Sequence, residues 1–155
     1  LEQPEPLFLI LENLQDPGNL GTMIRTGEGA GITGVIMNQQ TVDIFNPKTI
    51  RATMGSIFRV PFVYVPELSP VLTQMHEKGI HTYAAHLKGQ KYYDSFSFRE
   101  PTAFLIGNEG NGLTKEISDQ AGQYLKIPME GKVESLNASI AAALLMYEAH
   151  RQRNL

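Results

Sequence analysis

The stretch LFLILENLQDPGNLGTMIRTGEGA, residues 7–30, decides the fold class. It opens with a short apolar run at residues 7–11, which predicts a buried strand. The segment Asp16-Pro17-Gly18-Asn19 follows and has the composition of a turn. A helical pattern comes next, at residues 19–30, and we expect Asn19 to be its N-cap. A buried strand that leads directly into a helix is the repeating unit of a parallel α/β sheet.

The same alternation continues along the rest of the chain. Short apolar runs predict further strands at residues 35–37, 61–65, 81–87, 102–106 and 124–127. Helical patterns lie between them at residues 47–58, 70–78 and 114–120, and a last helix is expected at residues 136–153. Asn46-Pro47 offers an N-cap followed by proline for the second helix. We therefore predict one α/β domain over residues 1–155, with a mainly parallel sheet flanked by helices.

The composition is that of a globular domain. Of its 155 residues, 42% are hydrophobic and 19% charged, which is enough to build a sizeable buried core. No apolar run approaches the roughly 20 residues that cross a bilayer, so we expect no membrane association. The chain contains no cysteine, which excludes disulfides and thiolate metal sites and is compatible with a cytoplasmic location.

The net charge of −3 argues against a nucleic-acid binder that works by bulk electrostatics. It leaves open an RNA enzyme that uses a local basic patch, a second subunit or an attached domain. The four histidines show no metal-ligand spacing, and no nucleophile elbow G-x-S-x-G is present. We therefore expect no metal.

Polar and glycine-rich segments stand where three predicted strands end, which is where open α/β sheets bind ligands. The first segment, residues 13–26, carries Arg25 on a helix whose positive end can attract an anion. Taken alone, such an arginine is more often a solvated surface residue.

The second segment is Gly107-Asn108-Glu109-Gly110-Asn111-Gly112, directly after the predicted strand at residues 102–106. Its glycines allow the backbone to approach a ligand closely. It lacks the lysine and hydroxyl of a P-loop, and it does not match G-x-G-x-x-G. A nucleotide-like ligand and a loop that only needs tight turns explain it almost equally well.

The third segment, residues 127–139, joins the last predicted strand to the last helix. On its own it favours a capping role, with Ser135 as the expected cap and Asn137 beside it. Leu136, Ile140, Leu144 and Tyr147 follow on one face of that helix. This face fits either an internal core helix or a contact between subunits.

Together, the three segments resemble the SpoU family, the TrmH-like RNA ribose methyltransferases of the SPOUT superfamily. The chain has N-x-x-D-P-G-N-x-G-x-x-x-R-T at residues 13–26, I-G-N-E-G-x-G-L at 106–113 and I-P-M-x-G-x-V-x-S-L-N-A-S at 127–139. Residues 45–48 and 51–56 are also similar to the family. The resemblance covers essentially the whole chain, with the motifs in the family's order.

The resemblance implies a fold with a deep C-terminal trefoil knot, and a homodimer. It implies methyl transfer from bound S-adenosylmethionine to a ribose 2′-hydroxyl of rRNA or tRNA, with rRNA slightly favoured. Family members often carry an N-terminal RNA-binding domain. Since this chain begins at Leu1 rather than Met, we expect such a domain to lie outside it.

The resemblance also implies which residues form the site. A donor pocket would draw on Leu87, Gly107, Glu109, Gly110, Ile127, Met129, Leu136 and Ala138. A catalytic group would comprise Arg25, Asn19, Glu109, Ser135 and Asn137. The family casts Arg25 as the base, but a guanidinium normally keeps its proton. We therefore favour a role for Arg25 in orienting the acceptor and stabilising the developing alkoxide.

Lys48, Arg51 and Arg59 make a candidate RNA-binding patch beside the helix that carries Arg25. A solvated helix face explains these three residues equally well.

Two other functions remain alternatives. One is a non-catalytic RNA- or cofactor-binding module that kept the fold; the intact motif residues count against it. The other is a nucleotide-dependent enzyme unrelated to methylation, against which the missing phosphate-loop lysine counts.

Overall fold

The structure is a computed structural model that describes residues 5–86, 89–132 and 135–155. A parallel sheet runs through its centre in the strand order β3-β2-β1-β5-β4-β6. The strands are β1 (Leu7–Leu11), β2 (Gly34–Asn38), β3 (Phe62–Val65), β4 (His81–Ala85), β5 (Thr102–Ile106) and β6 (Gln123–Leu125). The helices are α1 (Pro17–Ala30), α2 (Pro47–Thr53), α3 (Ser69–Glu77), α4 (Lys115–Gln120) and α5 (Ala138–Arg153), with 3-10 turns η1 (Ser56–Phe58) and η2 (Tyr93–Ser95).

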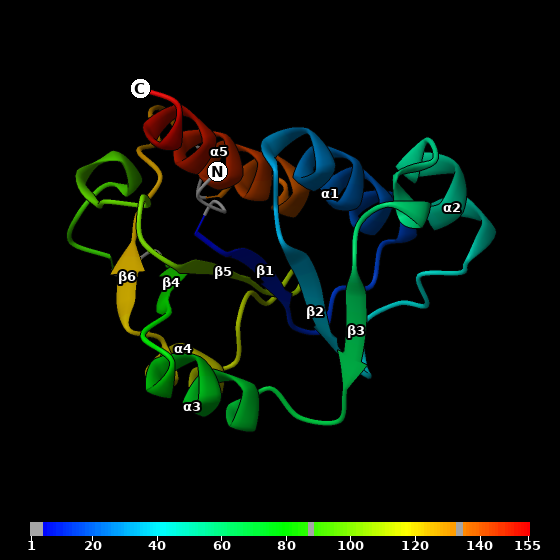
Figure 1. Cartoon of the computed structure of the whole chain (residues 1–155), viewed down its shortest axis with the longest axis horizontal. Coiled ribbons are helices and arrows are strands. Elements are labelled where there is room, and N and C mark those ends of the chain that lie inside the picture. The colour runs from blue at the N-terminus through cyan, green and yellow to red at the C-terminus, as the bar shows by residue number, and fades with distance from the viewer. Residues whose placement is uncertain (1–4, 87–88, 133–134) are drawn as a thin grey trace.

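The helices form two layers on the sheet (Figure 1). α1, α2 and α5 lie side by side over one face, and α3 and α4 lie over the other. The side chains of β1 divide accordingly: Leu7, Leu9 and Leu11 pack in the core under α1 and α5, whereas Ile10 packs under α3 and α4. Both faces of the strand are covered, so it is apolar throughout rather than alternating, as parallel sheets require.

The predicted α/β class and mainly parallel sheet are confirmed, and every predicted strand is found within a few residues of its expected limits. The predicted strand at residues 81–87 ends at Ala85, and Leu87 lies outside the described residues. No helix of the described residues is long and apolar enough to cross a bilayer.

The prediction of one helix at residues 47–58 is wrong. The chain leaves α2 at Met54, where φ is 50°, and Gly55 continues in the left-handed region with φ 92°. These two residues end the helix in the manner of an αL cap, and η1 starts after them. The predicted cap Asn46 is confirmed, because its side chain accepts a hydrogen bond from the Lys48 amide.

Two predicted caps are wrong by a short distance. The cap of α1 is Asp16, whose Oδ1 accepts a hydrogen bond from the amide of Asn19 at 3.1 Å. The cap of α5 is Asn137 rather than Ser135, and its Oδ1 accepts from the amide of Ser139 at 2.8 Å. In both places the chain offers several capping residues in succession, and the backbone path selects one of them.

The predicted apolar face of the last helix is not the buried one. α5 buries Ala142, Leu145, Met146 and Ala149 against the sheet. Ile140, Leu144 and Tyr147 are 52%, 37% and 45% exposed. The structure therefore excludes the internal-core interpretation for this stripe within a single chain. The trefoil knot stays a prediction, because residues 133–134, on the path into α5, lie outside the described part.

Candidate functional site

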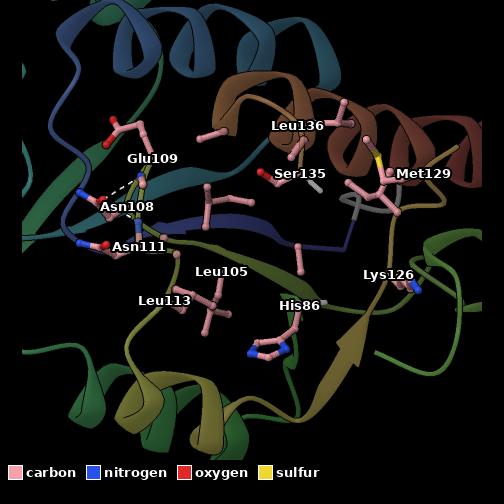
Figure 2. A pocket seen from close by; sticks show the side chains of 18 residues that line it. His86, Leu105, Asn108, Glu109, Asn111, Leu113, Lys126, Met129, Ser135 and Leu136 are labelled. Carbon is pink, nitrogen blue, oxygen red and sulfur yellow. Dashed lines mark hydrogen bonds between the residues drawn. The ribbon is translucent and has the colours of Figure 1, made fainter. Parts of the chain in front are cut away.

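A cavity of about 550 Å³ lies at the carboxyl ends of β4, β5 and β6. The turn after β5 forms one wall, and the segment between β6 and α5 forms another. Figure 2 shows Asn108, Glu109 and Asn111 at one end of the cavity, and Met129 and Lys126 at the other. This is the edge of the sheet at which parallel α/β folds bind ligands.

Glycine is required at the first position of the turn after β5. A Cβ on Gly107 would lie 2.1 Å from the Leu113 nitrogen and 2.2 Å from the carbonyl carbon of Gly112. The chain therefore crosses itself too closely for any side chain at this point. Gly112 itself has φ 68°, and its amide donates a 2.8 Å hydrogen bond to the Asn108 carbonyl, which closes the turn.

The side chain of Asn108 stabilises the same turn from within. Its Oδ1 accepts hydrogen bonds from the amides of Gly110 at 2.9 Å and Asn111 at 3.0 Å (dashed in Figure 2). A backbone held this way presents a fixed surface to the cavity. The need for tight turns, which the sequence offered as an alternative, is thus real and coexists with a ligand-sized space.

Most of the expected donor residues line this one cavity. They come from both motif segments: Gly107, Glu109, Gly110, Ile127, Met129, Leu136 and Ala138. Leu87 lies outside the described residues, so its expected place is not tested.

Several lining residues escaped the sequence prediction. Leu105 and Leu113 flank the glycine turn, Ala141 follows on α5, and His86 and Lys126 come directly after β4 and β6. The His86 ring stacks on Tyr124 with centroids 4.9 Å apart and an angle of 19°. The sequence signal that could have found His86 and Lys126 is their position directly after a strand, because the other loops on this side of the sheet were predicted from the same signal.

The expected catalytic residues divide into two groups. Glu109 and Ser135 line the cavity together, but Arg25, Asn19 and Asn137 are not among its lining residues. Oδ1 of Asn137 caps α5, next to the cavity wall, by accepting hydrogen bonds from the amides of Ser139 and Ile140. Arg25 is exposed on α1.

Glu109 holds backbone rather than another side chain. Its Oε1 accepts hydrogen bonds from the amides of Gln15 at 3.0 Å and Asp16 at 2.8 Å, and its Oε2 accepts from Gln15 at 3.1 Å. The carboxylate thus connects the cavity wall with the residues that lead into α1.

A second, apolar hollow lies between α1 and α5 on the outer face of the helical layer. Thr22 and Thr26 of α1 line it, together with Ile140, Leu144 and Tyr147 of α5. The two helices approach closely here, because a Cβ on Gly29 would lie 2.6 Å from the Tyr147 hydroxyl oxygen. Arg25 lies between Thr22 and Thr26 in the sequence of α1. It is a sequence neighbour of residues that line this hollow, and it is not among the residues that line the cavity.

The three candidate RNA-binding cations are not equivalent. Arg59 donates from Nη2 to Glu28 Oε1 at 2.9 Å and from Nε to Oε2, and Ser56 donates to the same carboxylate. The hydrogen bond from Arg59 holds the pKa of the Glu28 carboxyl below its ordinary value, and that from Ser56 adds to the effect. Lys48 and Arg51 are exposed on α2 and form no ion pair with any described residue.

The described residues include no cluster of three or more histidine or acidic side chains placed to hold a metal ion. The polar groups that line the cavity are backbone and asparagine amides, the Glu109 carboxylate, the Ser135 hydroxyl, the His86 imidazole and the Lys126 ammonium, beside an apolar wall. Such a lining suits an organic ligand with a few polar edges.

Comparison with known proteins gives a consistent result. Residues 6–147 match the SpoU rRNA Methylase family. The chain is 36% identical over 150 residues to a protein of Bacillus subtilis named putative TrmH family tRNA/rRNA methyltransferase YacO, and covers 60% of it. It is 37% identical over 139 residues to the B. subtilis 23S rRNA (guanosine(2553)-2′-O)-methyltransferase RlmP, of which it covers 56%.

A solved structure agrees with these relatives. The AdoMet-bound rRNA methyltransferase from Sinorhizobium meliloti superposes with a TM-score of 0.88 at 36% identity, over 96% of this chain and 57% of that one. The chain thus spans roughly three fifths of the relatives it matches. With matching motifs, fold and sequence, this chain belongs to the SpoU rRNA methylase family.

Proposed function

We propose that this chain transfers a methyl group from S-adenosylmethionine to a ribose 2′-hydroxyl of rRNA or tRNA, with rRNA slightly favoured. The observation that carries the proposal is the cavity at the ends of β4, β5 and β6, which both donor motifs line. RlmP, a relative at 37% identity, is named for 2′-O-methylation of 23S rRNA, and the S. meliloti relative binds AdoMet.

The cavity suits this donor in size and chemistry. Its volume of about 550 Å³ is in the usual range for a small-molecule site. Ile127, Met129 and Leu136 would cover the flat faces of an adenine ring, while the backbone of the glycine turn would bond its polar edge. When bound, the donor supplies a methyl group already activated by the positive sulfonium.

The chain's own residues then have to place the acceptor and manage its proton. The new bond joins the ribose oxygen to the methyl carbon, the carbon–sulfur bond breaks, and the hydroxyl proton leaves to solvent. We propose that Arg25 donates hydrogen bonds to this oxygen as negative charge develops on it. Ser135, Asn137 and Asn19 would orient the acceptor.

A homodimer would bring Arg25 to the reaction. Arg25 is exposed on α1 and is not among the residues that line the cavity, so in this proposal one chain alone does not assemble both halves of the site. The start of α5 touches both hollows: Ala138 and Ala141 line the cavity, and Ile140 and Ala143 line the apolar hollow. A second copy seated on that hollow would therefore place its α1, and its Arg25, beside the donor cavity.

RNA would also contact the basic face of α2. Lys48 and Arg51 are free to neutralise phosphates, whereas Arg59 would first have to leave Glu28. An additional RNA-binding domain and a cytoplasmic location stay predictions from the sequence.

Two measurements separate the alternatives. Calorimetric titration with S-adenosylmethionine should give saturable binding; no binding would favour a nucleotide-dependent enzyme of another kind. Transfer of a radiolabelled methyl group to total RNA should follow. Binding without transfer, even by the longest available form of the protein, would favour a non-catalytic module.

A further inference from the structure

Four side chains hold the loop between β1 and α1 against the glycine turn after β5 and against the end of β2. They are Asn13, Asn38, Asn108 and Glu109, and we refer to them as the loop clamp. Glu109 and Gln15, which form a hydrogen bond between the two loops, are 94 residues apart in the sequence. The glycine turn borders the cavity, and the β1–α1 loop leads into the helix that carries Arg25.

Asn13 is at the centre of the clamp. Its φ is 56°, a left-handed conformation that side chains other than asparagine and aspartate rarely adopt. Its amide donates to Asn38 Oδ1 at 2.9 Å, and its own Oδ1 accepts from Asn38 Nδ2 at 2.8 Å. Asn38 is only 7% exposed, so this pairing fixes the Asn13 loop to the end of β2.

Asn108 completes the connection to the glycine turn. Its Nδ2 donates to the Asn13 carbonyl at 2.8 Å, while its Oδ1 accepts from Gly110 and Asn111 within the turn. One amide group thus has two separate tasks. The oxygen shapes the turn, and the nitrogen joins the turn to the β1–α1 loop.

Glu109 makes the second connection, through the amides of Gln15 and Asp16. Asp16 is the cap of α1, so the carboxylate acts one residue before the helix begins. Oε1 accepts from both amides, and Oε2 only repeats the bond to Gln15. Oxygens occupied in this way are poorly placed to take a proton from the acceptor.

We propose that Asn108 and Glu109 are positioning residues that couple the donor cavity to α1, so that occupancy of the cavity fixes the helix that carries Arg25. This rests on the proposed function for the identity of the donor. Because coupling between two sites is reciprocal, the order of the β1–α1 loop and the affinity for the donor change together. Glu109 acts through backbone amides rather than as a base.

Asn108→Asp tests the Asn108 connection selectively. The variant keeps an oxygen to accept from Gly110 and Asn111, but it replaces the Nδ2 donor with an acceptor that faces the Asn13 carbonyl. Asn154→Asp adds the same charge at the far end of α5 and serves as the matched control. Thermal melting of both variants reports whether the fold persists.

Amide hydrogen exchange distinguishes coupling from a merely structural role, because a structural role would not change the protection that the ligand gives to distant amides. In the wild type, S-adenosylhomocysteine should slow exchange at Gln15 and Asp16 about tenfold, and in Asn108→Asp this extra protection should largely vanish. The turnover number of that variant should fall about tenfold, with a smaller change in KM for the donor. Ligand protection and turnover equal to those of Asn154→Asp would overturn the proposal.

Glu109 variants provide an independent test, also usable if Asn108→Asp does not fold. Glu109→Gln keeps Oε1 and its two hydrogen bonds, so it should lose far less turnover than Glu109→Ala, by about a factor of ten. The pH dependence of the turnover number should be the same in Glu109→Gln as in the wild type. Equal losses in the two variants, or a fall of the wild-type rate in acid that is absent from Glu109→Gln, would instead make Glu109 a proton acceptor. If the wild type binds the donor but transfers no methyl group, the proposed function fails and the coupling does not. The exchange experiment still measures the coupling, because it does not depend on methyl transfer.

Discussion

The donor cavity and the outer face of α1 and α5 lie on either side of the same helix start, yet they differ in completeness. The cavity is lined by three strand ends, two loops and the start of α5, all of a single chain. The outer face leaves Ile140, Leu144 and Tyr147 in solvent, beside the helix that carries Arg25. In the proposed function, one chain therefore holds the donor and a second copy supplies Arg25 for the acceptor chemistry.

The physical basis of the difference is the covering of apolar surface. In the cavity, apolar residues such as Met129 and Leu136 line a ligand-sized space. On the outer face, the comparable side chains Ile140, Leu144 and Tyr147 stay 52%, 37% and 45% exposed in one chain. Exposed apolar surface of this kind is typical of protein–protein contacts, and we therefore propose that a second copy covers it.

The largest effect is expected from a substitution that distorts the cavity wall. Gly107→Ala forces a Cβ against backbone atoms of Gly112 and Leu113, so we expect donor affinity in calorimetry to fall about 100-fold. Gly110→Ala adds a Cβ to the same cavity-lining turn without a backbone clash, since this Cβ would meet only Asn108 Oδ1, at 3.6 Å, so its loss of donor affinity should be clearly smaller. Equal losses in the two variants would show that the crossing of the chain at Gly107 does not shape the site.

The next effect separates the two regions. Arg25→Lys keeps the charge but loses the planar fork, so methyl transfer should fall about 100-fold. Arg25 lies outside the cavity, so calorimetry should give a donor affinity within about twofold of wild type. A matching loss of donor affinity would place Arg25 in the cavity and contradict the division.

A third variant removes the proposed partner from the outer face. Leu144→Asp puts a charge into the apolar stripe and should convert a dimer to a monomer in sedimentation, with loss of transfer but retained donor binding. Leu155→Asp is the control, since Leu155 is 79% exposed at the end of the chain. A wild type that sediments as a monomer at high concentration would refute the dimer.

The RNA-binding face is expected to show a smaller, salt-dependent effect. Replacing Lys48 and Arg51 by alanine should lower the slope of log affinity for RNA against log salt by about 1.5. Arg59→Ala should change the slope less, because that guanidinium is already paired with Glu28. An unchanged slope in the double variant would assign α2 to an ordinary solvated face.

The smallest effect is a pH dependence on the same face. The Arg59 hydrogen bond lowers the pKa of Glu28 in the folded protein, so the pair stabilises the fold above the ordinary carboxyl pKa. This stabilisation is lost as pH falls through the lowered value. The wild type should therefore melt at a slightly higher temperature than Glu28→Gln at neutral pH, and this difference should disappear in acid. A difference that widens in acid would contradict the sign.

The sequence predicted those parts of the molecule that depend on local pattern. Every strand and both cavity loops follow from apolar runs and from the glycines at strand ends. The break at Met54 and Gly55 was missed, because residues 47–58 are compatible with helix and the left-handed turn only shows in the backbone. The caps failed for a related reason, since Asp16 and Asn137 compete with equally suitable neighbours.

Long-range contacts could not be read from local pattern at all. Glu28 and Arg59 are 31 residues apart, and their pairing follows from the packing of α1 beside η1. The division between Glu109 and Ser135, inside the cavity, and Arg25, outside it, likewise depends on which face of α1 the fold buries.

The position of the transferred methyl group tests the central claim most directly. RNA labelled from radioactive S-adenosylmethionine would be hydrolysed in alkali, which cleaves every linkage that has a free 2′-hydroxyl. We predict that the label survives in alkali-resistant dinucleotides, as methylation of the ribose oxygen requires. Label released in mononucleotides would place the methyl group on a base and contradict ribose methylation by this chain.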